Sequence, residues 1–166
     1  MDGVVSAGPR GREFDTTAVA VQAIIVNEAE EILLLSSQKR KQGWQLVSGA
    51  LDANETVIAA TLREVHEELG GDIEVRPLGT VHVQTFRYDE QIPTMLSIYT
   101  LYTYQGGDVK PGDDMVGSDF RWWSLEELDG SLELFHATVK PWMLKRAVEL
   151  YRFWVNQPEL PLQPSL

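Results

Sequence analysis

The sequence predicts a fold of the α/β or α+β class, in which helices cover a mixed β-sheet. The 166 residues suit one domain with a sizeable core. Apolar residues make up 43% of the chain and charged residues 23%, which is usual for a globular protein. The predicted elements run in the order strands, one central helix, further strands and a terminal helix. That order favours a single sheet covered by helices.

The first half of the chain contains three predicted strands. Residues 16–27, TTAVAVQAIIVN, are apolar and rich in β-branched side chains, as expected of a buried central strand. Residues 31–38, EILLLSSQ, follow a short polar turn and are predicted to be its hairpin partner. After a basic loop at 39–43, residues 44–49, WQLVSG, are predicted to form one short strand that runs into Gly49.

The second half adds two long strands and a terminal helix. Residues 73–88 and 94–104 are β-rich segments joined by a short polar stretch. Residues 105–119, QGGDVKPGDDMVGSD, are rich in Gly and Asp and predict a mobile loop that is too polar to pack. FRWWSLEEL, residues 120–128, predicts a strand that enters a helical turn. Residues 138–155 have apolar side chains at helical spacing and predict the terminal helix.

The central helix lies between Asn54 and Gly70. Asn54 precedes the helical pattern and is a favourable N-cap residue. Gly70 follows the pattern and is expected to end the helix. The histidine of this segment, His66, is expected at the surface. Apolar residues recur at i, i+4, i+7 and i+11 and predict the buried stripe: Ile58, Leu62, Val65 and Leu69.

Two or three carboxylates are expected to project from one face of this helix. Glu64 and Glu68 are one turn apart, about 40° on the helical wheel, and Glu67 flanks them one turn after Arg63. Like charges at i,i+4 destabilise a helix by a few tenths of a kcal/mol, so a cation is a candidate to offset the repulsion. Ligands that are all oxygen favour a hard cation, Mg²⁺ before Mn²⁺ or Ca²⁺. The alternative is a solvated charged face.

The spacing of these residues resembles the Nudix box. Gly71 stands where that box usually has an apolar residue, and Ser48-Gly49-Ala50 replaces its frequent Pro-Gly-Gly turn. The resemblance implies an α/β fold, an α/β/α sandwich with a mixed sheet, over residues 14–155. Residues 1–13 would then form a flexible arm, and residues 156–166 a tail. The residues that carry the resemblance are Gly49, Glu55, Arg63, Glu64, the apolar Val65, Glu67, Glu68 and Gly70.

The resemblance implies an enzyme that cleaves a diphosphate linkage in a nucleoside diphosphate derivative, with Mg²⁺ or Mn²⁺ as cofactor. Glu64 and Glu68 would be the main metal ligands, and Glu67 would assist. The carbonyl of Ser48 or Gly49 could complete the coordination shell. A diphosphate isomerase of the same superfamily resembles this fold but uses a catalytic cysteine. The chain has no cysteine, which excludes that reading.

The remaining roles implied by the resemblance concern orientation and proton transfer. Arg63 would orient a carboxylate of the box through a charge-assisted pair. Glu55, at the start of the helix, would hold position or hold a metal-bound water. In many family members an acid from a later loop acts as base or ligand, and Asp113 and Asp114 are the candidates here. The weaker candidates for that acid are Asp119 and Glu90.

The substrate is expected to be a small nucleotide. Tyr88 lies seventeen residues past Gly71, a family hint for dinucleoside polyphosphates, and Phe86 stands where a proline would indicate ADP-ribose. We therefore place a dinucleoside polyphosphate or nucleoside triphosphate slightly ahead of ADP-ribose or a nucleotide sugar. A nucleotide-binding module without catalysis is the alternative of another class, but such modules usually lose glutamates of the box.

Composition limits the partners. The net charge of −11 argues against a nucleic-acid polymer, which requires clustered Lys and Arg. No stretch approaches the roughly 18 apolar residues of a membrane span. The absence of cysteine excludes disulfides and thiolate metal sites. The first residues lack the pattern of a signal peptide, so a cytoplasmic location is expected. Both a monomer and a homodimer stay open.

Overall fold

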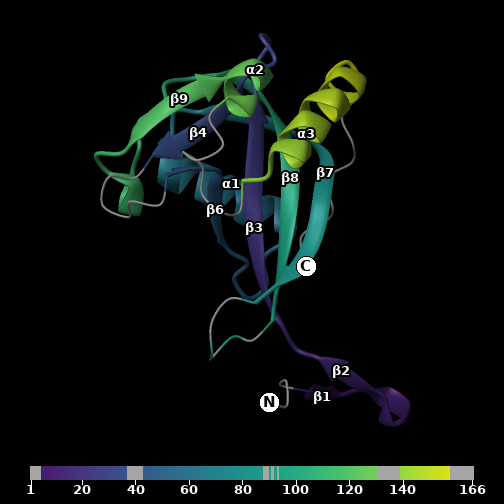
Figure 1. Ribbon diagram of the computed structural model, residues 1–166. Helices are drawn as coiled ribbons and strands as arrows, with labels where there is room; N and C mark the ends of the chain where they lie inside the picture. Colours follow the sequence, from purple (N-terminus) through teal and green to yellow (C-terminus); the bar gives the residue numbers. More distant parts are fainter. Residues whose placement is uncertain are drawn as a thin grey trace.

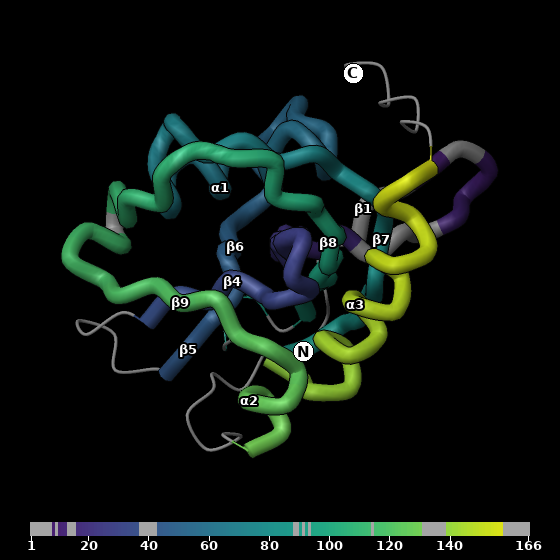
Figure 2. Tube along the Cα trace, turned by 90° about the horizontal axis from the view of Figure 1, so that it is seen from above, coloured from purple at the N-terminus to yellow at the C-terminus, as the bar shows by residue number. Residues whose placement is uncertain are grey.

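The protein is an α/β/α sandwich. The computed structural model describes residues 5–36, 43–87, 90, 92, 94–130 and 139–157. Helix α1 covers one face of a seven-stranded sheet, and α2 and α3 lie on the other face (Figure 1, Figure 2). This arrangement confirms the predicted architecture. The helices are α1 (Val57–Leu69), α2 (Leu125–Asp129) and α3 (Pro141–Trp154).

The sheet is mixed, as predicted. Its main path has the order β5-β4-β3-β8-β7, while β6 pairs with β3 and β9 pairs with β4. Strands β3 and β8 are parallel, and the other pairs are antiparallel. The strands are β3 (Ala18–Val26), β4 (Ile32–Ser36), β5 (Trp44–Gln45), β6 (Val47–Ala50), β7 (Glu74–Phe86), β8 (Met95–Gly106) and β9 (Asp119–Trp123).

Strand β3 forms the centre of the core. Its side chains alternate between the two faces of the sheet, as they must in a strand. Ile24 and Val26 join the apolar cluster under α2 and α3, whereas Ala23 and Ile25 join the cluster under α1. All four are buried. The apolar, β-branched run therefore forms the buried central strand that its composition predicted.

One detail of the strand prediction was wrong, and one predicted pairing is shorter than expected. Residues 44–49 form two strands instead of one, because the chain changes partners at Leu46: β5 pairs with β4, and β6 pairs with β3. Strand β4 pairs antiparallel with β3, as predicted, but only at Val26 opposite Ile32. Strand β9 pairs with the other edge of β4 along its whole length. The expected hairpin is therefore short, because β6 occupies the edge of β3 from Ala20 to Ala23.

The segment interpreted as an N-terminal arm, residues 1–13, contains part of a hairpin. Strand β1 (Val5–Ala7) pairs antiparallel with β2 (Glu13–Asp15) across a 3-10 turn, η1 (Pro9–Gly11). This hairpin lies away from the main sheet (Figure 1). Such short strands, separated by Gly and Pro, have too little alternation to be predicted from sequence.

The terminal helix α3 packs on the face of the sheet opposite α1. It begins with Pro141 in its first turn, a position where the missing N–H costs nothing. Residues 131–138 precede it and lie outside the described part of the chain. No helix among the described residues is both long and apolar enough to cross a membrane. The residues of α3 that are buried against the sheet are Met143, Leu144, Ala147, Val148 and Tyr151.

Candidate active site

Helix α1 starts two residues later than predicted and ends where predicted. Its N-cap is Thr56, whose side-chain oxygen accepts a hydrogen bond from the N–H of Ala59 at 3.2 Å. Asn54 instead has a φ of 68°, the left-handed conformation that Asn tolerates in a turn. At the other end, Gly70 has a φ of 94° and its N–H donates to the carbonyl of His66.

The buried face of α1 includes an acidic residue. Val65 and Leu69 are fully buried as predicted, but Ile58 and Leu62 are only half-buried. Glu68 is 3% exposed, so its carboxylate lies within the protein. A carboxylate at such a position needs compensating partners. The exposed His66 agrees with the predicted surface position.

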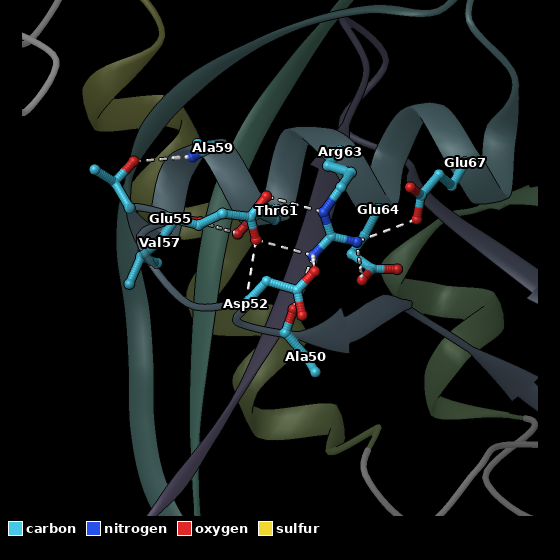
Figure 3. Close-up of polar contacts among 10 residues, drawn as sticks. Ala50, Asp52, Glu55, Val57, Ala59, Thr61, Arg63, Glu64 and Glu67 are labelled. Carbon is cyan, nitrogen blue, oxygen red and sulfur yellow. Dashed lines mark hydrogen bonds and ion pairs between the residues drawn. The ribbon is translucent and has the colours of Figure 1, made fainter. Parts of the chain in front are cut away.

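Arg63 lies at the centre of the carboxylate cluster (Figure 3). Its Nε and Nη2 donate to the two oxygens of Glu55, each at 3.0 Å. Its Nη1 donates to Glu64 at 2.7 Å and to Glu67 at 3.1 Å. The second bond from Nη2 goes to the carbonyl oxygen of Ala50 at 2.9 Å. These contacts use all five N–H groups of the guanidinium, so its orientation is fixed.

Two members of this network were not predicted from the sequence. Ala50 contributes only its backbone carbonyl, which has no sequence signature. Asp52 lies 3.8 Å from Nη2 of Arg63, a longer and exposed ion pair. Their place at the end of β6 and in the turn that follows it is the one signal that could have suggested either residue.

The carboxylates of the cluster differ in their electrostatic environment. Hydrogen bonds from Arg63 lower the pKa of Glu55. Burial raises the pKa of Glu64, although Arg63 acts in the opposite direction. The same glutamates raise the pKa of Arg63, which stays protonated. Ionised Glu64 is therefore under-compensated, and an additional cation beside it would stabilise its charge.

Strand β6 packs against the glutamates of α1. The N–H of Ser48 donates to Oε2 of Glu68 at 3.3 Å. A β-carbon at Gly49 would lie 1.9 Å from Cδ of Glu64, so a side chain at this position would displace that carboxylate. The pairing of Val21 with Gly49 fixes β6 against the central strand. The glycine turn and the acidic helix thus form one rigid unit.

Comparison with known proteins now identifies the family. The NUDIX domain model matches residues 16–143. The chain belongs to the Nudix family. Solved structures under 25% identical support the fold: a NUDIX hydrolase from Nitrosomonas europaea has a TM-score of 0.62 at 20% identity and covers 83% of this chain and 90% of that one. An ADP-ribose pyrophosphatase from Streptococcus suis has a TM-score of 0.63 at 23% identity, covering 82% and 93%.

Two curated relatives are also similar to this chain. The NAD-capped RNA hydrolase NudC of Vibrio parahaemolyticus is 28% identical over 110 residues, which cover 63% of this chain and 38% of that protein. The 8-oxo-dGDP phosphatase NUDT18 of Danio rerio is 29% identical over 130 residues, which cover 68% and 38%. The chain thus spans less than two-fifths of the length of these relatives.

The loop after β8 of this Nudix domain differs from the prediction. It packs on the C-terminal end of α1, where the N–H of Lys110 donates to the carbonyl of Leu69 at 2.7 Å. The N–H of Gly112 donates to the carbonyl of Glu68 at 3.1 Å. Met115 is fully buried in the cluster under α1. The loop is held because it supplies donors for carbonyls that have no partner within the helix, and because Val109 and Met115 pack in this cluster.

The candidate acids of this loop come directly after the residues that bind α1. Asp113 and Asp114 lie in a 3-10 turn, η2 (Asp113–Met115), beside α1. The side chain of Asp113 is exposed, and that of Asp114 lies outside the described part. Asp119 begins β9 and is exposed, as is Glu90. Tyr88, which supported the substrate prediction, also lies outside the described residues.

The Nudix carboxylates fit a hard divalent cation by their chemistry. The donor set is all oxygen, and the carboxylate of Glu68 is buried where an ionised group needs a counter-charge. Among the described residues, no three acidic or histidine side chains yet converge as a metal-binding group. Arg63 occupies oxygens of Glu64 and Glu67 in this arrangement. Both side chains would have to exchange part of that contact for the cation.

Proposed function

We propose that this Nudix domain, residues 14–155, hydrolyses a diphosphate linkage in a nucleoside diphosphate derivative with Mg²⁺ or Mn²⁺. The observation that carries the proposal is the carboxylate cluster of α1. One arginine with all its donors in use orients three glutamates, and a fourth, Glu68, is buried beside them. A solvated charged face would not need this fixed orientation. A cytoplasmic location is a further part of the proposal, and the oligomeric state, monomer or homodimer, stays open.

In this proposal Glu64 and Glu68 hold the cation, Glu67 assists, and the carbonyl of Ser48 or Gly49 completes the shell. When bound, the cation neutralises the diphosphate and lowers the pKa of the attacking water. Its net positive charge also allows an acidic protein to bind an anionic substrate. The buried position of Glu68 supports its role, because a carboxylate in that environment gains most from a cation.

The other residues orient the cluster and accept a proton. Arg63 would keep the carboxylates in a fixed relative orientation. Glu55 would hold Arg63 through both of its carboxylate oxygens. Asp113 or Asp114 would accept the proton of the attacking water as general base. In-line attack at phosphorus spreads charge over the non-bridging oxygens, so positioning and electrostatics supply most of the rate.

The substrate is proposed as a small nucleotide, with a dinucleoside polyphosphate or nucleoside triphosphate slightly ahead of ADP-ribose or a nucleotide sugar. The names of the relatives, 8-oxo-dGDP phosphatase and NAD-capped RNA hydrolase, also denote nucleotide derivatives. The net charge of −11 supports a small substrate over a polymer.

A panel of nucleotides tests the proposal. Diadenosine tetraphosphate, dGTP, ADP-ribose and a UDP-sugar would each be incubated with the protein and Mg²⁺ or Mn²⁺, in water enriched in ¹⁸O. We expect cleavage of a diphosphate linkage in at least one of them, with ¹⁸O in one phosphate-containing product. Binding of a nucleotide without product would instead favour the non-catalytic module.

Metal binding is expected to raise the melting temperature. A cation that binds the folded state alone stabilises it by a free energy that grows with the logarithm of its concentration over Kd, so a concentration about a hundredfold above Kd should add about 5 °C or more. Glu68→Gln should remove most of this rise, because it deletes the buried charge. Glu126→Gln, on the exposed surface of α2, is the control. A wild-type melting temperature that does not change in millimolar Mg²⁺ or Mn²⁺ would refute the prediction.

Replacing the general base should slow turnover. At least one of Asp113→Asn and Asp114→Asn is expected to lower kcat about tenfold or more, a lower bound because general-base catalysis typically contributes about a hundredfold or more. Asp129→Asn, at the exposed end of α2, is the matched control and should keep wild-type kcat. If both loop variants retain full turnover on the best substrate, the base lies elsewhere, with Glu55 or Glu90 next to test.

A further inference from the structure

We propose that residues 107–112 clamp the C-terminal turn of α1, and that Gly112 is a positioning residue for the glutamates of that turn. This inference rests on the proposed function, because it concerns the carboxylates that would hold the cation. It assigns a role to a loop that carries none of those carboxylates. The clamp consists of backbone hydrogen bonds, two anchors and one close backbone contact.

The hydrogen bonds engage the last residues of α1. The carbonyls at the end of a helix have no partner within the helix. The N–H of Gly112 binds the carbonyl of Glu68 at 3.1 Å, and the N–H of Lys110 binds that of Leu69 at 2.7 Å. The residue that provides the buried carboxylate is therefore held directly by the loop.

Both ends of the loop are anchored. On one side, Gly107 accepts a hydrogen bond from the hydroxyl of Tyr104 and lies so close to Asp72 that a β-carbon would come 1.9 Å from its carbonyl oxygen. On the other side, buried Met115 accepts a weak hydrogen bond from Nε2 of Gln45 at 3.5 Å. The loop therefore cannot move away from α1 without disturbing packed neighbours.

Gly112 packs directly against the backbone of α1. A β-carbon at Gly112 would lie 2.7 Å from the carbonyl oxygen of Glu67, which is backbone and cannot rotate aside. Gly112 has a φ of −120°, a conformation that any residue adopts. The glycine is thus required by proximity and not by backbone conformation. An added methyl group has to separate the loop from the helix end that carries Glu67 and Glu68.

Gly112→Ala and Gly130→Ala form a matched pair that tests the clamp. Gly130 also has an ordinary φ, −86°, but a β-carbon there would meet its nearest atom at 3.8 Å. Metal-free proteins would be titrated with Mn²⁺, and free Mn²⁺ would be measured by electron paramagnetic resonance. We expect about tenfold weaker binding for Gly112→Ala, as for other outer-shell changes, and wild-type binding for Gly130→Ala. Equal binding by all three proteins would overturn the inference.

The same variants distinguish an effect on the position of the glutamates from an effect on folding. Far-ultraviolet circular dichroism and urea unfolding would show that Gly112→Ala is folded under the conditions of the titration. On the best substrate, kcat should fall with Mn²⁺ affinity in Gly112→Ala and stay at the wild-type value in Gly130→Ala. A Gly112→Ala protein with weaker folding but unchanged Mn²⁺ affinity per folded molecule would contradict the positioning role.

A measurement on the wild type makes the test independent of any variant. Amide hydrogen exchange at Lys110 and Gly112 should be slow, and it should slow further when Mg²⁺ binds, because the clamp and the carboxylates share one helix end. Unchanged exchange at saturating Mg²⁺ would overturn the inference while leaving the proposed hydrolysis intact. Absence of any Mn²⁺ binding by the wild type would overturn both.

Discussion

Glu64→Gln is expected to lower kcat by about a thousandfold or more while the fold stays intact. The change removes a charge and little volume. A cation that has lost one of its two main carboxylates stabilises the developing charge less, and a loss of about 4 kcal/mol corresponds to a thousandfold. Because burial raises the pKa of Glu64, keeping it ionised costs free energy of folding. The metal-free variant should therefore unfold at the same urea concentration as wild type or a higher one.

The matched control for this change is Glu126→Gln, an exposed glutamate of α2. It carries the same chemical change far from the cluster and should keep wild-type kcat and stability. Steady-state kinetics on the best substrate and urea unfolding would be measured for all three proteins. Comparable turnover in wild type and Glu64→Gln would show that the carboxylate plays no part in the reaction.

Arg63→Lys is expected to lower both stability and turnover. Lysine carries three donors at one point, so it cannot replace a planar group that serves five acceptors. Several carboxylate oxygens and the carbonyl of Ala50 would lose their partner. For this partly buried network, unfolding free energy should fall by about 1–3 kcal/mol. Turnover should fall about a hundredfold, because the carboxylates lose their common orientation.

Arg146→Lys, on the exposed side of α3, is the corresponding control and should behave as wild type. Urea unfolding and kcat would be compared for both variants at the same Mg²⁺ concentration. If Arg63→Lys retains wild-type turnover, the fixed guanidinium is not needed to orient the cluster, and the cation alone would organise the glutamates.

Much of the site could be predicted from side-chain spacing. Glu64, Glu67 and Glu68 follow helical periodicity, which places them on one side of α1 whatever the rest of the chain does. The boundary at Gly70 was also predictable, since glycine is favoured just after a helix. The start of α1 was not. Both Asn54 and Thr56 are good caps, and only the turn conformation of Asn54 decides between them.

The contacts between the loop and α1 could not be predicted, because they are made by the backbone. Peptide N–H groups at Lys110 and Gly112 occur in every sequence, and a Gly- and Asp-rich loop is usually solvated. Val109 and Met115, which pack in the cluster under α1, were the apolar residues that could have indicated packing. The division of residues 44–49 into β5 and β6 depends in the same way on which neighbouring edges are free. Periodicity within one segment contains no information about the backbone contacts of the loop or about the division into β5 and β6.

Calorimetric titration of Mn²⁺ tests the central claim most directly, since the account makes Glu64 and Glu68 the principal cation ligands. Metal-free wild type and the double variant Glu64→Gln/Glu68→Gln would be titrated under identical conditions, with circular dichroism to confirm that both are folded. The account predicts saturable binding to the wild type and at least about a hundredfold weaker binding to the double variant. Equal affinity in the two proteins, or no binding to the wild type, would contradict it.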